Sequence, residues 1–253
     1  MKLLKFLRLS AWALAGLLGL MPSAHAVLPI QHWQQPGGAR VYLVESHNIP
    51  MVDVQIDLDA GSRRDPPDKP GLASAAAGQL ASGIRAQPGL HGPYAKALDE
   101  NRLGEAWADL GASFSASASG DRLSFALRSL SDPDLLEQAA QLAARQMAHP
   151  AYPQQVWLRD RDKMAAAIRE SLTRPGTVAQ NRFAEAVYGG HPYGWRTTPE
   201  SLQRIGVADF QRWHAQALRP CRAVVSVVGD VTRAQADALV TRLLALWPDR
   251  KSV

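Results

Sequence analysis

Histidine, cysteine and acidic side chains are the residues with which this chain could hold a catalytic metal ion. A zinc site needs three or four such ligands that converge, and two of them usually stand close together in the sequence. The histidines after residue 26 form no His-x-His and no His-x-x-x-His pair, so we expect them to be surface or loop residues: His32, His47, His91, His149, His191 and His214. Cys221 is the single cysteine, which excludes an internal disulfide, and its apolar surroundings predict a buried side chain.

Ser74 is the remaining candidate for chemistry, as a nucleophile. The residues around it, Ala73 and Ala75, do not form the Gly-x-Ser-x-Gly elbow of serine hydrolases, and the pattern implies no neighbouring His or Lys as its base. We therefore expect a buried helical serine whose hydroxyl bonds its own helix backbone.

Ser74 lies in residues 70–80, PGLASAAAGQL, the stretch around which the chain is organised. Leu72, Ala76 and Leu80 recur every four residues, which predicts a closely packed core helix from Leu72 to about Ser82. The polar and Pro-rich residues 65–70 in front of it predict an exposed loop.

The surroundings of this helix carry a resemblance to a known family. The arrangement resembles the zinc site of the insulinase and pitrilysin peptidases. It consists of an alternating strand that ends at residues 57–63, a Pro-rich loop and the triplet Gly-Leu-Ala at 71–73. In active members of that family a His-x-x-Glu-His motif follows, in which both histidines bind zinc and the glutamate activates its water. Here the three positions hold Ser74, Ala77 and Gly78.

A later helix of the family supplies the third zinc ligand, a glutamate eight residues before a Pro-Gly pair. The matching run, residues 166–176, places Ala167 at that position and Glu170 three residues further on. The matches continue at residues 191–194 (HPYG) and 224–230 (VVSVVGD), so the resemblance spans nearly all of residues 27–253. More residues separate Gly78 from Ala167 than in most active relatives. We expect these extra residues in a loop from Gln87 to Arg102.

The resemblance implies a zinc peptidase half-domain that has lost its site. Three ligands and the general base are absent, and the base alone contributes about 10² to 10⁴ in rate. We therefore expect no enzyme activity, no catalytic residue and no cofactor, with zinc held only by an active partner.

Three functions follow from this resemblance. The first is a partner subunit of an active zinc peptidase of the same family, in a heterodimer that closes a chamber around peptides. The second is a stand-alone periplasmic protein that binds peptides on an exposed strand edge or acts as a scaffold. The third, which we consider weaker, is an active metalloendopeptidase with an unrecognised site. Relatives usually contain two half-domains, so we expect the second to be missing or truncated here.

The N-terminus reads as a secretory signal. Lys2, Lys5 and Arg8 precede an apolar run, and Ala24 and Ala26 provide the small residues that a signal peptidase needs. We expect cleavage after Ala26 and export to a bacterial periplasm, with no membrane span in the mature chain.

Removal of residues 1–26 lowers Lys plus Arg from 28 to 25 against 23 acidic residues, so the net charge of residues 27–253 is only +2. A nucleic-acid-binding face would need a concentrated basic stripe. We therefore expect peptides and a protein partner, and no nucleic acid.

The elements that must position these residues alternate between strands and helices. Period-two patterns predict strands at 40–45, 51–59, 112–119, 122–129 and 221–228. Helical patterns follow at 98–110, 133–148, 154–172, 175–187, 199–205, 207–217 and 232–246. This order predicts an α+β fold in which a mostly antiparallel sheet is covered by helices, as in one half-domain of the insulinase and pitrilysin fold.

Overall fold

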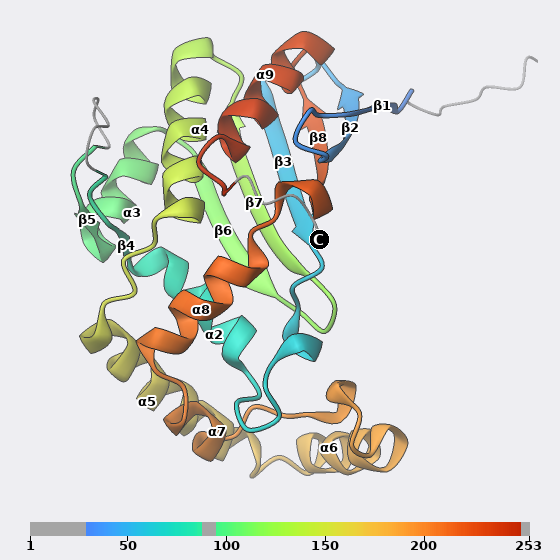
Figure 1. The fold of residues 1–253 in the computed structure, drawn as a ribbon, viewed down its shortest axis with the longest axis vertical. Coiled ribbons are helices and arrows are strands. Elements are labelled where there is room, and N and C mark those ends of the chain that lie inside the picture. Colours follow the sequence, from blue (N-terminus) through green and yellow to red (C-terminus); the bar gives the residue numbers. More distant parts are fainter. Residues whose placement is uncertain (1–28, 88–94, 249–253) are drawn as a thin grey trace, which may run out of the picture.

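A six-stranded sheet forms the body of the molecule. The computed structural model describes residues 29–87 and 95–248, and its sheet has the strand order β1-β2-β8-β3-β7-β6 (Figure 1). Only β2 and β8 pair in parallel; the other pairs are antiparallel. The strands are β1 Gln31–Gln34, β2 Arg40–Glu45, β3 Met51–Leu58, β6 Ser113–Ala118, β7 Leu123–Leu130 and β8 Val224–Gly229. The predicted α+β class is confirmed.

The sheet has one apolar and one polar face because its strands alternate. On β3, Val54 and Ile56 are buried, and Ile56 stands opposite the buried Phe125 of β7. Gln55 and Asp53 point to the other face, where Asp53 forms an ion pair with Arg128 of β7 (2.7 Å). This register fixes the apolar face against the helices, since a slip by one residue would exchange the two faces.

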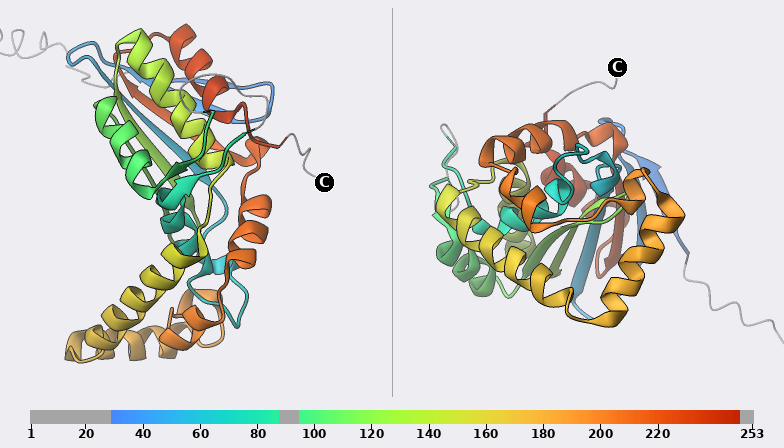
Figure 2. Two further views of the ribbon diagram at one scale, coloured as in Figure 1. Left: turned by 90° about the vertical axis from the view of Figure 1, so that its left-hand side faces the viewer. Right: turned by 90° about the horizontal axis from the view of Figure 1, so that it is seen from below.

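Helices cover the apolar face and continue beyond one end of the sheet. α4 and α9 lie side by side over the strands, whereas α5 and α6 extend away from them (Figures 1 and 2). The helices are α2 Leu72–Gly78, α3 Glu100–Asp109, α4 Pro133–Ala148, α5 Gln154–Ser171, α6 Pro175–Tyr188, α7 Pro199–Gln203, α8 Val207–Ala217 and α9 Arg233–Leu244. Within the described ranges, no helix combines the length and apolarity that a membrane crossing requires.

Helix α2 begins where a buried carboxylate holds its first N–H groups. Asp65 is 5% exposed and accepts hydrogen bonds from the N–H groups of Gly71 (2.8 Å) and Ala73 (2.9 Å). Burial raises the pKa of Asp65, and the N–H groups of Ala73 and Gly71 act in the opposite direction. Gly71 has φ +98°, and a Cβ there would lie 2.5 Å from Thr197 Oγ1, so only glycine fits.

The loop before α2 is also clamped from the other side by α7 and α8. Lys69 Nζ lies 2.7 Å from Asp209 Oδ1, and Ser201 Oγ donates to the carbonyl of Pro70 (2.8 Å). Burial alone would raise the pKa of Asp209, but its bonds from Lys69, Gly206 and Arg212 hold that pKa below the usual range. The position and orientation of α2 therefore also depend on contacts between residues that are more than 100 positions apart in the sequence.

Several boundaries differ from the sequence prediction. α3 begins at Glu100 because Leu98 and Asp99 form strand β5, which pairs with β4 (Gly83–Ile84), and Asp99 caps the helix. The expected loop from Gln87 to Arg102 is therefore wrong for its last residues, since strand β5 and the start of α3 occupy residues 98–102. Residues 88–94 lie outside the described part. β8 begins at Val224, since Pro220–Arg222 form a 3-10 turn. Cys221 in that turn is only half-buried, so its expected burial is wrong.

We predict that Asp65→Ala lowers the free energy of unfolding by about 2 kcal/mol, because it leaves two N–H groups at the start of α2 without their acceptor. Asp65→Asn keeps one acceptor oxygen and is expected to lose less. Urea unfolding followed by circular dichroism measures both. Asp68→Ala in the same loop is the control, and an equal loss in that variant would contradict the role of Asp65.

Candidate functional site

Helix α2 presents one narrow face to solvent. Ser74 and Gly78, four residues apart, are exposed, whereas Ala73, Ala76 and Ala77 are buried. Residues four apart on a helix share a face, so the two positions expected for zinc-binding histidines are next to each other at the surface. Ala77, at the position of the general base, is 1% exposed.

The Ser74 hydroxyl is bound to the sheet. Its Oγ donates to the carbonyl of Ala118, the last residue of β6, over 3.2 Å. The predicted buried serine that bonds its own helix is thus wrong, because the side chain lies on the one solvent-exposed face of α2. Gly78 has ordinary helical angles, and a Cβ there would meet no atom within 4 Å. The structure therefore has open space at Gly78 and a carbonyl acceptor at Ser74.

Ala167, at the expected third-ligand position, is exposed on α5. This helix is linked to the end of α2 by Gln79, whose Nε2 donates to Asp160 Oδ2 over 2.8 Å. Ala167 lies seven residues beyond Asp160 on the same face, about 10 Å further along the helix. Glu170 is held in an exposed ion pair with Arg174 (2.8 Å). No local spacing predicts the Gln79–Asp160 contact, since these residues are 81 positions apart.

Asp160 is an ionised carboxylate in this setting. Its hydrogen bond from Arg159 lowers its pKa most, the one from Gln79 adds to this, and partial burial acts in the opposite direction. Arg159 in turn binds Glu100 of α3 (2.9 Å). Asp160 thus binds both Gln79 and Arg159. These contacts link the start of α5 to the end of α2 and, through Glu100, to α3.

Two of the described histidines are neighbours: His149 at the end of α4 and His214 of α8, where burial and, to a smaller extent, the charge of His149 lower the pKa of His214. The other three lie elsewhere in the fold. His32 stacks on Tyr42, His47 Nδ1 lies 2.6 Å from Asp230 Oδ1, and His191 accepts from the N–H of Tyr193. His214 corrects the prediction of surface or loop histidines, because it is part of α8 and its ring contacts the carbonyl of Met147 (2.6 Å).

Groups of three or more His, Cys, Asp or Glu that could hold a metal ion are not found in ranges 29–87 and 95–248. His91 lies outside those ranges. That Ser74, Ala77, Gly78 and Ala167 hold no metal stays a prediction.

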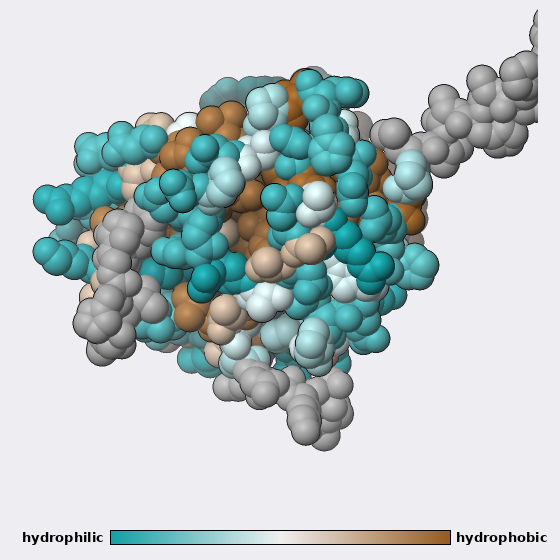
Figure 3. Space-filling view, turned by 90° about the horizontal axis from the view of Figure 1, so that it is seen from above, coloured by the Kyte–Doolittle hydropathy of each residue, from teal (hydrophilic) through white to brown (hydrophobic). Residues whose placement is uncertain are grey.

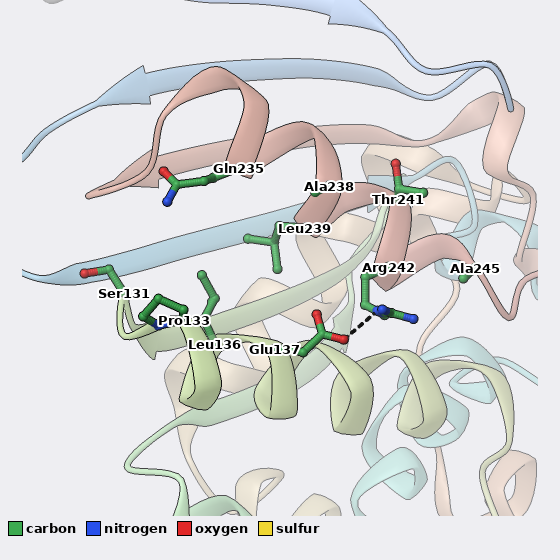
Figure 4. Close-up of a pocket in the computed structure, with 10 residues that line it drawn as sticks. All are labelled: Ser131, Pro133, Leu136, Glu137, Gln235, Ala238, Leu239, Thr241, Arg242 and Ala245. Carbon is green, nitrogen blue, oxygen red and sulfur yellow. Dashed lines mark ion pairs between the residues drawn. The ribbon is translucent and has the colours of Figure 1, made fainter. Parts of the chain in front are cut away.

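A hollow of about 460 Å³ opens between α4 and α9. Apolar side chains lie in it, with polar ones around them (Figures 3 and 4), and the ion pair of Glu137 with Arg242 (2.8 Å) crosses it. Leu136 and Leu239 point into the space between the helices. No histidine or cysteine is among the residues that line this hollow.

Comparison with known proteins finds similarity in solved structures alone; neither a family model nor a curated protein matches the sequence. An inactive domain of an M16 peptidase from Pseudomonas fluorescens is 28% identical, with a TM-score of 0.81, and the match covers 89% of this chain and 52% of that one. The first half of the periplasmic protease PqqL from Escherichia coli is 15% identical (TM-score 0.72, 88% and 47%). Pitrilysin is 19% identical (TM-score 0.71, 92% and 24%).

This chain therefore spans about half the length of the first two structures and a quarter of pitrilysin. The likenesses below 25% identity show the shared fold. The Pseudomonas structure adds sequence similarity to a protein described as inactive. The fold predicted from the sequence, one half-domain of a larger architecture, is confirmed.

We predict that the double variant Ser74→His, Gly78→His binds Zn²⁺ with micromolar or weaker affinity and does not hydrolyse peptides. Two imidazoles four residues apart can share an ion, but Ala167 supplies no third ligand and Ala77 no base. Titration calorimetry with zinc chloride and a fluorogenic peptide assay measure the two properties. Ser74→His alone is the control; zinc binding by the parent chain as tight as by the double variant would contradict the prediction.

Proposed function

We propose that this chain, a half-domain similar to those of the insulinase and pitrilysin (M16) peptidase family, is an exported, non-catalytic subunit of an active zinc peptidase. One observation carries the proposal. The exposed face of α2, where relatives hold their metal, consists of Ser74 and Gly78, and a methyl group at Ala77 is buried beneath it. A chain with this surface can contribute shape and binding area to proteolysis, while the partner contributes zinc and the base.

The contribution to peptide binding would come from the sheet. β6 is the last strand of the sheet, and the residue at its end, Ala118, is the one that contacts Ser74. A free strand edge binds an extended peptide through backbone hydrogen bonds. Next to it, the polar face of the sheet forms a shallow hollow of about 400 Å³ lined by short side chains such as Ser115, Ala126 and Ser226. These surfaces suit one wall of a peptide chamber.

Export is part of the proposal and rests on residues 1–26, which lie outside the described part of the chain. The similarity to PqqL, described as a periplasmic protease, supports a periplasmic location. The division of the chain into a signal peptide, residues 1–26, and a half-domain, residues 27–253, is likewise a proposal.

The alternative function, a stand-alone peptide-binding or scaffold protein, uses the same strand edge without a partner. Gel filtration of native extracts separates the two proposals. Migration together with a zinc peptidase supports the subunit role, and migration at the size of this chain alone supports the stand-alone role.

We predict that adding this protein to the purified active family member of the same bacterium raises peptide hydrolysis until the two are equimolar. A second chamber wall holds the peptide near the zinc, so the increase is expected mainly as a lower KM. A titration with a fluorogenic peptide measures it, with heat-denatured protein as control. An unchanged rate of hydrolysis at a peptide concentration below KM, across the whole titration, would contradict the subunit role.

A further inference from the structure

Helix α6 carries an apolar face that nothing in the described chain covers. None of its fourteen residues is buried. Ala179, Phe183, Ala186 and Val187 follow the spacing i, i+4, i+7, i+8, which places them on one side of the helix. Phe183 is 68% and Val187 56% exposed. In a chain whose other helices bury an apolar side, this arrangement is typical of a helix that packs against a partner.

Exposed apolar side chains are concentrated in this part of the molecule. Eleven large apolar residues are exposed within the described ranges, and six of them lie between residues 172 and 193: Leu172, Val178, Phe183, Val187, Tyr188 and Tyr193. Single exposed apolar residues need no explanation, but a group of them marks an interaction surface.

The helix is anchored firmly at its C-terminal end. The rings of Tyr188 and Tyr193 are 5.9 Å apart, and Tyr193 Oη donates to Asp121 Oδ1 in the β6–β7 turn (2.8 Å). Asp121 also pairs with Arg63 (2.9 Å). The arm formed by α5 and α6 (Figure 2) is thus tied to the sheet, and its apolar face is held in a defined position before a partner arrives.

The size of the face indicates a partner larger than another α6 helix. A helix of fourteen residues is about 21 Å long and about 10 Å wide, which gives a face of about 200 Å². Two such faces packed together would bury about 400 Å², well below the roughly 1,200 Å² of a small stable interface. The face therefore fits the apolar centre of a wider contact with a folded domain, rather than a dimer of two α6 helices.

The arm that carries this face has an excess of basic residues, although on α6 itself Arg182 pairs with Glu185 (3.1 Å). Residues 159–196 contain seven Lys or Arg and four Asp or Glu, a net charge of +3, whereas residues 27–253 as a whole carry about +2. A partner with acidic residues around an apolar centre is complementary to this arm, and such charges mainly raise the association rate.

We propose that the apolar face of α6 docks a folded half-domain of the active zinc peptidase, through an apolar surface rimmed by acidic residues. This inference rests on the proposed function. The solved structures similar to this chain contain its fold as one half or one quarter of a longer chain, which makes a folded unit of similar size the suitable occupant.

The test uses the full mature chain and the purified family member of the same bacterium that carries an intact His-x-x-Glu-His motif. Phe183→Asp is expected to weaken binding in biolayer interferometry at least tenfold, and Phe183→Ala by a smaller factor. Ile49→Asp is the matched control, because Ile49 is exposed to a similar degree (62%) but lies in the β2–β3 turn, outside the arm. Thermal unfolding checks that all variants fold. The affinity of the parent chain is expected to fall between 50 and 500 mM NaCl.

Each other outcome overturns the inference in a recognisable way. If Phe183→Asp binds as tightly as Ile49→Asp, the subunit role stands and the docking face is wrong. If the parent chain does not bind the peptidase at all, the subunit role itself fails and the inference with it. If sedimentation shows a homodimer that Phe183→Asp dissociates, the occupant is a second copy of this chain instead of a peptidase.

Discussion

The buried carboxylate of Asp65 is the interaction on which the rest of the structure depends. By accepting the N–H groups of Gly71 and Ala73, it fixes the residue at which α2 begins. Because a helix turns 100° per residue, the starting point also decides that Ser74 and Gly78 face solvent and Ala77 faces the core. The clamp of Lys69 on Asp209 keeps this orientation from the side of α8.

This orientation fits the proposed non-catalytic role, because the chain has the fold of an M16 half-domain with small residues on the outward face of α2. The outward positions of α2 are those at which zinc ligands would stand, and small residues occupy them without disturbing the packing beneath. Neither Ser74 nor Gly78 belongs to the core, so the packing beneath α2 does not depend on their side chains. The edge of β6 and the polar face of the sheet are built from other residues. The proposed binding surface therefore does not need the residues of a zinc site.

The sequence predicted the elements well wherever the pattern was local. Alternation along β3 and the Asp132-Pro133 start of α4 led to the correct strand and helix, because each signal lies within a few residues. Sequence failed where distant groups decide. β1 was not predicted because its burial comes from pairing with β2 and from contacts to α9. The exposure of Ser74 likewise depends on Ala118 of β6, which no local spacing reveals. Cys221 is a different case, because the neighbouring Pro220 opens a turn and this local signal was missed.

Metal content measured together with proteolysis tests the central claim most directly. Protein purified from the periplasm without chelators would be analysed for zinc by mass spectrometry and assayed for peptide hydrolysis before and after addition of a chelator. The absence of catalytic chemistry predicts far less than one zinc per chain and no hydrolysis that a chelator abolishes. One zinc atom per chain, with proteolysis that stops when the chelator is added and returns when zinc is restored, would contradict it.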